Sequence, residues 1–165
     1  MEYKRKAIFF DRDGVINVNK HYVFRIQDFN FVPGIFSIME TFQNDFLLFI
    51  VTNQSGVARG YFSESKVQDL HRWMLQKFQD KNINIEKVFY CPHHPDFTQD
   101  CDCRKPKPGM IMDAAKQYSL DLGNSIMIGD NDTDILAAEG AGVGKTIKVE
   151  SNDLSNVFKF IEHGI

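Results

Sequence analysis

Residues 7–14 read Ala-Ile-Phe-Phe-Asp-Arg-Asp-Gly, a run of four apolar residues followed at once by two carboxylates and a glycine. A continuous apolar run of this length is typical of a strand that is buried on both faces. Further short apolar runs lie at 46–51, 88–90, 125–128 and 146–149, with helically spaced apolar residues between them. This alternation predicts an α/β fold: a three-layer sandwich on a mostly parallel sheet.

The composition fits a single globular domain over residues 1–165, with 43% hydrophobic and 25% charged residues. The formal net charge is −3 and no extended Lys/Arg block occurs, which argues against a nucleic-acid partner. The longest apolar run, residues 46–51, is far shorter than a membrane span, and the N-terminus lacks a signal-peptide pattern. We therefore expect a cytoplasmic protein with no membrane contact.

Polar side chains follow three of the predicted strands, and one precedes a helix. Asp11 and Asp13 follow the first strand, residues 52–56 (Thr-Asn-Gln-Ser-Gly) the second, and residues 129–134 (Gly-Asp-Asn-Asp-Thr-Asp) the strand at 125–128. Lys105 comes just before a predicted helix. Ligands of open α/β sheets bind beyond the carboxyl ends of the strands, so we expect these groups to meet in one crevice.

This set of side chains favours phosphoryl transfer. Of two carboxylates at alternate positions after a strand, one can act as nucleophile and the other as acid and base. Asp130 and Asp134 add the oxygen ligands that Mg²⁺ prefers. The Thr52 hydroxyl and the Lys105 ammonium suit the charged oxygens of a transferring phosphoryl group. Each motif alone is also typical of a turn, a loop or a helix cap; all four in this order favour a catalytic site.

All three cysteines lie close to a pair of histidines, in the stretches 91–94 (Cys-Pro-His-His) and 101–103 (Cys-Asp-Cys). An odd number of cysteines makes no disulfide framework, and the clustering favours a metal. Three thiolates and one imidazole complete a tetrahedral Zn²⁺ site, which is structural because no coordination position is open. Residues 91–103 are therefore predicted to form a zinc loop, with His93 and His94 competing as the fourth ligand.

The strand-end motifs resemble those of the haloacid dehalogenase (HAD) superfamily of phosphohydrolases. These motifs are hhhhDxDx, a hydroxyl residue after the second strand, a lysine at a helix start, and GDxxxD; they stand here as residues 8–14, Thr52, Lys105 and residues 129–134. An Asp at position 13 is typical of the phosphatases in the superfamily, whereas the dehalogenases lack it. The resemblance implies a Rossmann-like fold and hydrolysis through an aspartyl-phosphate.

The zinc loop narrows the resemblance to a capless branch that holds the heptose bisphosphate phosphatases and the histidinol-phosphate phosphatases. The patterns DRDGxIN…YV, TNQSGxARGYF and CPHHP…CxCRKPxPGM are most similar to the heptose family. That family implies hydrolysis of the 7-phosphate of D-glycero-D-manno-heptose 1,7-bisphosphate. The product is a precursor of nucleotide-activated heptose, which is used to build bacterial surface glycans such as lipopolysaccharide. Histidinol phosphate is the alternative substrate. The predicted elements already fill the spacing between Asp13, Thr52 and Lys105, which agrees with the absence of a cap domain. A capless single domain shows no obvious interface signature, so we expect a monomer.

The resemblance also implies roles for individual residues. Asp11 would be the nucleophile and Asp13 the acid and base, while Thr52 and Lys105 would stabilise the phosphoryl group and Asp134 would orient Lys105. The expected magnesium ligands are Asp11, Asp13, Asp130 and Asn131, and the expected zinc ligands are Cys91, His93, Cys101 and Cys103.

Substrate contacts are expected around this centre. Arg104 is expected to bind the second phosphate, because its guanidinium fork suits phosphate oxygens. The expected sugar contacts are Asn19, His21, Tyr22, Asn53, Gln54, Ser55 and Arg59. Asn19, His21 and Asn131 depart from the heptose family, which tends to have Asp, Gly and a basic residue there.

Other function classes fit less well. Residues 144–146 (Gly-Lys-Thr) resemble the end of a P-loop, but Glu139 stands where the first glycine is needed and the segment precedes a strand. A zinc-stabilised binding module would leave the strand-end carboxylates unexplained. A nucleic-acid 3′-phosphatase would need a basic groove, which the net charge of −3 disfavours.

Overall fold

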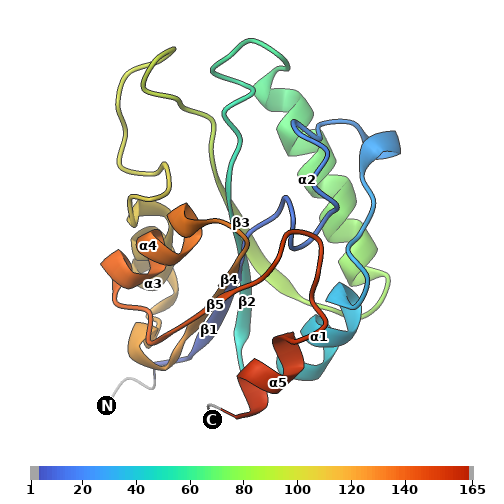
Figure 1. Ribbon diagram of the computed structural model, residues 1–165, viewed down its shortest axis with the longest axis vertical. Coiled ribbons are helices and arrows are strands. Elements are labelled where there is room, and N and C mark those ends of the chain that lie inside the picture. The colour runs from blue at the N-terminus through green and yellow to red at the C-terminus, as the bar shows by residue number, and fades with distance from the viewer. Residues whose placement is uncertain (1–3, 164–165) are drawn as a thin grey trace.

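The fold is known from a computed structural model, which describes residues 4–163. One five-stranded parallel sheet has the order β3-β2-β1-β4-β5 (Figure 1). The strands are β1 Ala7–Phe10, β2 Leu47–Asn53, β3 Ile85–Cys91, β4 Ile126–Gly129 and β5 Lys145–Lys148. The α-helices of the described part are α1 Ile35–Phe42, α2 Glu64–Gln79, α3 Gly109–Tyr118, α4 Asp132–Ala141 and α5 Val157–Glu162. Short 3-10 helices lie at Ile26–Asp28 and Leu122–Asn124.

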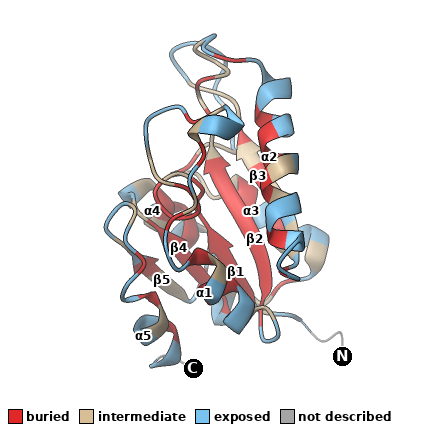
Figure 2. Cartoon of the chain, turned by 90° about the vertical axis from the view of Figure 1, so that its right-hand side faces the viewer, coloured by how far each residue is buried: buried red, intermediate tan, exposed pale blue. Residues whose placement is uncertain are grey.

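Helices cover both faces of the sheet, so the predicted three-layer α/β sandwich is confirmed (Figure 1). Alternate residues of β1 point to opposite layers. Ile8 and Phe10 pack in the apolar cluster with α1, α2 and α5, whereas Ala7 and Phe9 pack in the cluster with α3 and α4. All four side chains are fully buried, and Figure 2 shows the central strands as a buried layer between exposed helix faces.

Strand β2 runs two residues further toward its carboxyl end than its apolar run, residues 46–51, predicts. β2 includes Thr52 and Asn53, which pair in register with Tyr90 and Cys91 of β3. Ladder hydrogen bonds join backbone groups, so the strands continue beneath polar side chains. Thr52 therefore lies on a rigid strand instead of in the loop that its polarity suggests.

The strand order creates a crevice at one edge of the sheet. β1 lies between β2 and β4, so the chain leaves β1 on one side and later returns on the other. Ligands of such sheets bind at this switch point. In the described part of the chain, the segments joining the strands hold the helices above and loops, of which residues 11–34 and 92–108 are the longest, and no cap domain is evident. None of the helices within residues 4–163 is long and apolar enough to cross a membrane.

Aromatic rings pack α1 and α2 against the sheet. The Phe78 side chain of α2 is fully buried, and its ring centroid lies 5.5 Å from that of Phe31 and 5.2 Å from that of Phe36. Replacing Phe78 with Ala should lower the free energy of unfolding by about 3–5 kcal/mol, because the ring leaves a cavity.

Urea unfolding measures this loss. The matched control is Phe160→Ala on α5, whose side chain is 51% exposed; its free energy of unfolding should stay within about 0.5 kcal/mol of the original. Equal losses in the two variants would contradict this account of the core.

Candidate active site

The side chain of Lys105 lies at the centre of the crevice and is only 3% exposed. Its ammonium donates to Asp11 Oδ1 at 2.8 Å, to Asp134 Oδ1 at 2.6 Å and to the Val51 carbonyl at 2.8 Å. These partners come from the end of β1, the start of α4 and β2, respectively. The structure therefore brings together groups from three of the predicted strand-end motifs.

Charge in this centre is unevenly balanced. Burial raises the pKa of Asp11 to about 8, with the Asp134 carboxylate adding to the rise and the Lys105 ammonium opposing it. Burial works against the charged form of Lys105 too, but the two carboxylates prevail and raise its pKa to about 12. Lys105 supplies one positive charge against two buried carboxylates, so the site favours binding of a further cation.

The two carboxylates beside Lys105 and a third one nearby can together hold a further positive charge. Asp11, Asp130 and Asp134 each offer an oxygen, and these atoms lie within 4.8 Å of one another. Burial, with a contribution from Asp134, raises the pKa of Asp130. The Asn131 amide donates to Asp130 Oδ1 at 2.9 Å and so orients it. An all-oxygen set of this kind fits Mg²⁺ and not a soft metal.

Asp13 is held by three donors. Its Oδ1 accepts from Arg12 at 3.0 Å and from Asn17 at 3.1 Å, and its Oδ2 accepts from Gln54 at 2.9 Å. Burial alone would raise the pKa of Asp13, but the Arg12 charge and these hydrogen bonds outweigh it and lower the pKa. Gln54, expected to contact sugar, is buried and also donates to Thr52 Oγ1 at 2.9 Å.

Asn53 positions the lysine segment. Its side-chain amide donates to the Lys105 carbonyl, and its Oδ1 accepts from the Lys105 backbone N–H, both at 3.0 Å. A cavity of about 130 Å³ opens above this pair. It is lined by Asp11, Asp13, Asn19, Asn53, Lys105, Asn131, Thr133 and Asp134. Thr133 is the lining residue to which the sequence assigned no role.

The remaining expected substrate contacts lie outside this cavity, toward the rim; they are His21, Tyr22, Ser55, Arg59 and Arg104. Tyr22 is 44% exposed, and its ring meets the ring of Tyr61 edge-on at 4.9 Å. The Arg59 guanidinium lies over the Phe97 ring at 4.9 Å. Arg104 donates to the His93 carbonyl at 3.4 Å, so the position of its side chain depends on the conformation of the predicted zinc loop.

The predicted zinc ligands converge. Cys91, His93, Cys101 and Cys103 each present one donor atom within 4.8 Å of the others. The Sγ atoms of Cys91 and Cys101 are 3.6 Å apart, and His93 Nδ1 lies 3.4 Å from Cys103 Sγ. Donors of a tetrahedral zinc site are separated by about 3.5–3.8 Å, given zinc–ligand bonds of about 2.0–2.3 Å.

Electrostatics and the neighbouring histidine agree with that set. Burial, with the adjacent thiols, raises the pKa of Cys103, so three thiolates at this spacing need a cation between them. The competing histidine, His94, points elsewhere: its Nε2 lies 3.1 Å from the Arg59 guanidinium. The geometry therefore favours His93 as the fourth ligand.

The structure adds two residues that the motifs did not reveal, Ser151 and Asn152 after β5. Asn152 accepts from the Asn19 backbone through its side chain at 2.7 Å and donates to the Gly14 carbonyl at 2.8 Å. Gly14 has φ +91°, and a Cβ there would overlap the Asp130 carboxylate and the Ser151 hydroxyl. In the sequence, only the position of residues 151 and 152 after a strand points to this turn. Its contacts with Gly14 and Asn19 form only in the folded chain and leave no motif.

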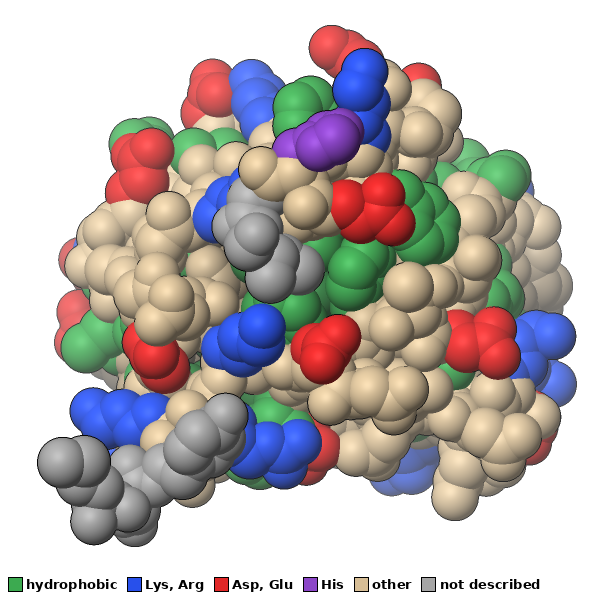
Figure 3. Space-filling view, turned by 90° about the horizontal axis from the view of Figure 1, so that it is seen from below, with side chains coloured by type: hydrophobic (Ala, Val, Ile, Leu, Met, Phe, Trp, Pro, Cys, Tyr) green, Lys and Arg blue, Asp and Glu red, His purple; other side chains and the backbone are tan. Residues whose placement is uncertain are grey.

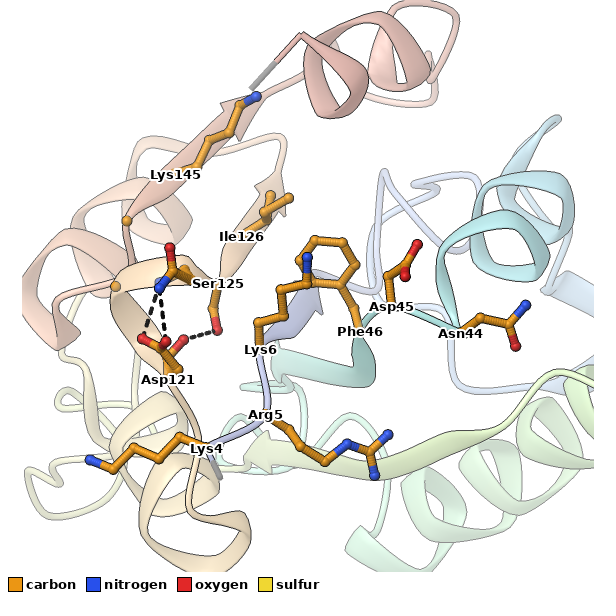
Figure 4. A pocket seen from close by; sticks show the side chains of 13 residues that line it. Lys4, Arg5, Lys6, Asn44, Asp45, Phe46, Asp121, Ser125, Ile126 and Lys145 are labelled. Atoms are coloured by element: carbon orange, nitrogen blue, oxygen red, sulfur yellow. Dashed lines mark hydrogen bonds between the residues drawn. The ribbon is translucent and has the colours of Figure 1, made fainter. Parts of the chain in front are cut away.

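A larger cavity, of about 820 Å³, lies at the opposite edge of the sheet, near the amino ends of β1, β4 and β5 (Figure 4). Its lining includes Lys6, Phe46 and Lys145, and the Lys6 ammonium lies 4.3 Å from the centre of the Phe46 ring. Figure 3 shows the molecule from this end, with Lys/Arg and Asp/Glu side chains interspersed. None of the expected site residues lines this cavity, so the smaller crevice is the candidate active site.

Comparison with known proteins agrees with this geometry. A family model described as HAD-hydrolase-like matches residues 102–154. The D-glycero-alpha-D-manno-heptose-1,7-bisphosphate 7-phosphatase of Campylobacter jejuni is 48% identical over 147 residues, covering 88% of this chain and 83% of that protein. The D-glycero-beta-D-manno-heptose-1,7-bisphosphate 7-phosphatase of Vibrio cholerae is 45% identical over 153 residues, covering 89% of this chain and 82% of that protein.

The chain belongs to the heptose bisphosphate phosphatase family of HAD hydrolases. A solved member, the D,D-heptose 1,7-bisphosphate phosphatase of B. bronchiseptica in complex with magnesium and phosphate, superimposes with a TM-score of 0.80 at 32% identity. The match covers 96% of this chain and 87% of that one. As a member of this family of HAD phosphatases, the chain is a phosphoric monoester hydrolase.

Removing the central cation tests the electrostatic account. Lys105→Met would leave Asp11 and Asp134 buried without a counter-charge, so the free energy of unfolding should fall by about 3–5 kcal/mol near neutral pH. The pKa of Asp11, already raised from 3.8 to about 8, would rise further. The unaltered protein shares the raised pKa, so both proteins should lose stability in parallel from pH about 4 to about 8. Above about 8 the unaltered Asp11 releases its proton while Asp11 of the variant keeps it, so the deficit of the variant should widen there.

Urea unfolding at several pH values measures this effect, and the deficit should be larger above pH about 8 than at neutral pH. The matched control is Lys116→Met, which removes an exposed lysine of α3 and should leave the free energy of unfolding within about 0.5 kcal/mol of the original. A deficit that does not vary with pH would contradict the assignment.

Proposed function

We propose that this chain hydrolyses the 7-phosphate of D-glycero-D-manno-heptose 1,7-bisphosphate. The observation that carries the proposal is the 48% identity to a phosphatase of that name over 88% of the chain, together with the carboxylate–lysine crevice. Relatives named for the alpha and the beta anomer are both close, at 48% and 45% identity. The proposal therefore covers the heptose bisphosphate without choosing an anomer.

The reaction follows from the roles of two carboxylates. Asp11 attacks phosphorus in line, and the bond from phosphorus to the sugar oxygen breaks as Asp13 gives that oxygen a proton. The product of this step is an aspartyl-phosphate. A water molecule then attacks its phosphorus while Asp13 takes the water's proton, and inorganic phosphate leaves with Asp11 restored.

Other side chains neutralise and orient the phosphoryl group. The Lys105 ammonium, beside Asp11 at 2.8 Å, and the Thr52 hydroxyl suit its equatorial oxygens. Asp134 holds Lys105 in place at 2.6 Å. Asp11, Asp130, Asn131 and the Asp13 backbone carbonyl would hold Mg²⁺, which when bound supplies charge neutralisation and a template for the phosphate.

Contacts to the rest of the substrate belong to the rim. Arg104 is proposed to bind the second phosphate. The proposed sugar contacts are Asn19, which lines the cavity, and His21, Tyr22, Ser55 and Arg59. Gln54 is better placed to hold Asp13, at 2.9 Å, than to reach a sugar. We propose a monomeric protein of the cytoplasm, where three metal-binding thiols stay reduced.

A substrate panel tests the proposal. Phosphate release with Mg²⁺ should be fastest on one anomer of heptose 1,7-bisphosphate and much slower on histidinol phosphate. Asp11→Asn should lower kcat by more than about 10³-fold, as loss of a nucleophile does. The matched control, Asp113→Asn on the exposed face of α3, should keep full activity. Faster turnover of histidinol phosphate would overturn the substrate assignment and leave the mechanism in place.

The zinc loop is proposed to be a structural Zn²⁺ site that places Arg104 and Lys105. Metal analysis of the purified protein should find about one zinc per chain. His93→Ala should lose that zinc, lower the melting temperature and reduce turnover, whereas His94→Ala should keep the zinc. Equal zinc content in the two histidine variants would refute the ligand set.

A further inference from the structure

One buried charge next to the nucleophile has no part in the reaction described above: Arg12, whose side chain is fully buried. Its Nη2 donates to Asp13 Oδ1 at 3.0 Å and to the Val23 carbonyl at 2.6 Å. Its Nη1 lies 3.1 Å from Nε2 of His71. Asp13 is its only carboxylate partner among the described residues. The guanidinium thus joins the predicted acid of the reaction to two other parts of the fold.

The state of His71 follows from its partner. A guanidinium has donors and no acceptor, so Nε2 of His71 must accept and the ring carries its proton on Nδ1. Burial, together with the Arg12 charge, lowers the pKa of His71 to about 3, which keeps the ring neutral. The side chain lies on the buried face of α2, 5% exposed, with Leu70 and Met74 on the same face.

These contacts leave Arg12 with one orientation. A long side chain can swing unless each end of its fork is held, and here α2 holds one end while Val23 and Asp13 hold the other. Within residues 4–163 the Arg12 Nε has no hydrogen-bond partner, so the guanidinium is held by its two Nη atoms. A general acid must be placed to within a fraction of an ångström, which needs support from residues that do not touch substrate.

We propose that His71 is a positioning residue for the phosphatase reaction: by holding Arg12, it fixes the Asp13 carboxylate in line with the leaving-group oxygen. The proposal rests on the proposed role of Asp13 as acid and not on the identity of the sugar. Helix α2 then positions, through His71 and Arg12, the carboxyl group that transfers the proton.

The choice of leaving group separates this role from a purely structural one. A sugar alkoxide is a strong base and needs a proton from Asp13 as it leaves, whereas p-nitrophenolate leaves as a stable anion. General-acid catalysis contributes about 10²–10⁴-fold to a rate. Asp13 also acts as the base in the second step, which is common to both esters and enters kcat, so the comparison uses kcat/KM, which reports the step in which the leaving group departs. Loosening the acid should lower kcat/KM for sugar phosphates and spare kcat/KM for the aryl phosphate. Damage to the fold as a whole would slow both alike.

The experiment compares His71→Leu, which removes the acceptor, with His71→Gln, whose side-chain oxygen can accept from Arg12. The substrates are heptose 1,7-bisphosphate and p-nitrophenyl phosphate. For His71→Leu, the ratio of kcat/KM on the sugar to kcat/KM on the aryl ester should fall by about tenfold or more. KM for the sugar should change little, and His71→Gln should restore most of the ratio.

Two further variants guard the interpretation. Met74→Val, also buried on α2 but without a hydrogen-bonding contact to Arg12, should lower the melting temperature and leave the ratio unchanged. Arg12→Lys keeps the charge without the fork, and it should lower the ratio even if His71→Leu fails to fold. An unchanged ratio in the His71→Leu and Arg12→Lys variants, with kcat/KM lowered equally on both esters or on neither, would overturn the proposal.

The substrate assignment can fail separately. If heptose 1,7-bisphosphate is not hydrolysed, the sugar phosphate that the unaltered protein hydrolyses fastest replaces it, and a fall in the ratio still supports the role of His71. Hydrolysis of the heptose with a flat ratio would reject the positioning role alone.

Discussion

The crevice depends on one buried ammonium. Lys105 connects Asp11 after β1, the carbonyl of Val51 in β2 and Asp134 at the start of α4, so a single side chain holds three elements at the topological switch point. Burying two carboxylates so close together is unfavourable unless a cation lies between them. The loop that delivers this lysine is itself held twice, by Asn53 on one side and by the cysteine–histidine cluster on the other.

The two carboxylates of the Asp-x-Asp motif are treated differently by the fold. Asp11 is buried beside another carboxylate, and its pKa is raised to about 8. Asp13 receives three hydrogen bonds, one from a guanidinium, and its pKa is lowered. Two acids separated by one residue therefore differ because of their neighbours. Without a bound cation these directions favour a protonated Asp11 and an ionised Asp13, whereas the proposed reaction needs the reverse. A cation beside Asp11 lowers its pKa, and phosphate oxygens beside Asp13 raise its pKa, so substrate and metal together would shift both groups toward their roles.

The sheet and its catalytic edge could be predicted because both depend on local patterns. Residues 7–10 form a strand as their unbroken apolar run indicates, and the strand-end motifs converge as parallel topology requires. Strand ends were less predictable: β2 continues through Thr52 and Asn53 because ladder hydrogen bonds do not depend on side-chain polarity. Sheet order has no local pattern at all, since it reflects pairing between distant segments.

Residues whose roles depend on contacts between distant segments could not be predicted from the sequence, for the same reason. Asn152 and Ser151 come long after the last motif, and only folding brings them to Gly14. Gln54 has the polarity of a substrate contact, yet the extension of β2 turns its amide inward to Thr52 and Asp13. His71 looks like one more residue on an amphipathic helix until its contact with Arg12 is seen.

Gly14 illustrates how the site limits evolutionary change. The Asp130 carboxylate occupies the volume that any Cβ at position 14 would need, and the backbone there has φ +91°. Every substitution at this codon must therefore displace a carboxylate that the proposed metal site uses. Sugar specificity can drift through rim residues such as Tyr22, but lineages that descend from this chain should keep glycine at position 14 whichever phosphate ester they come to hydrolyse.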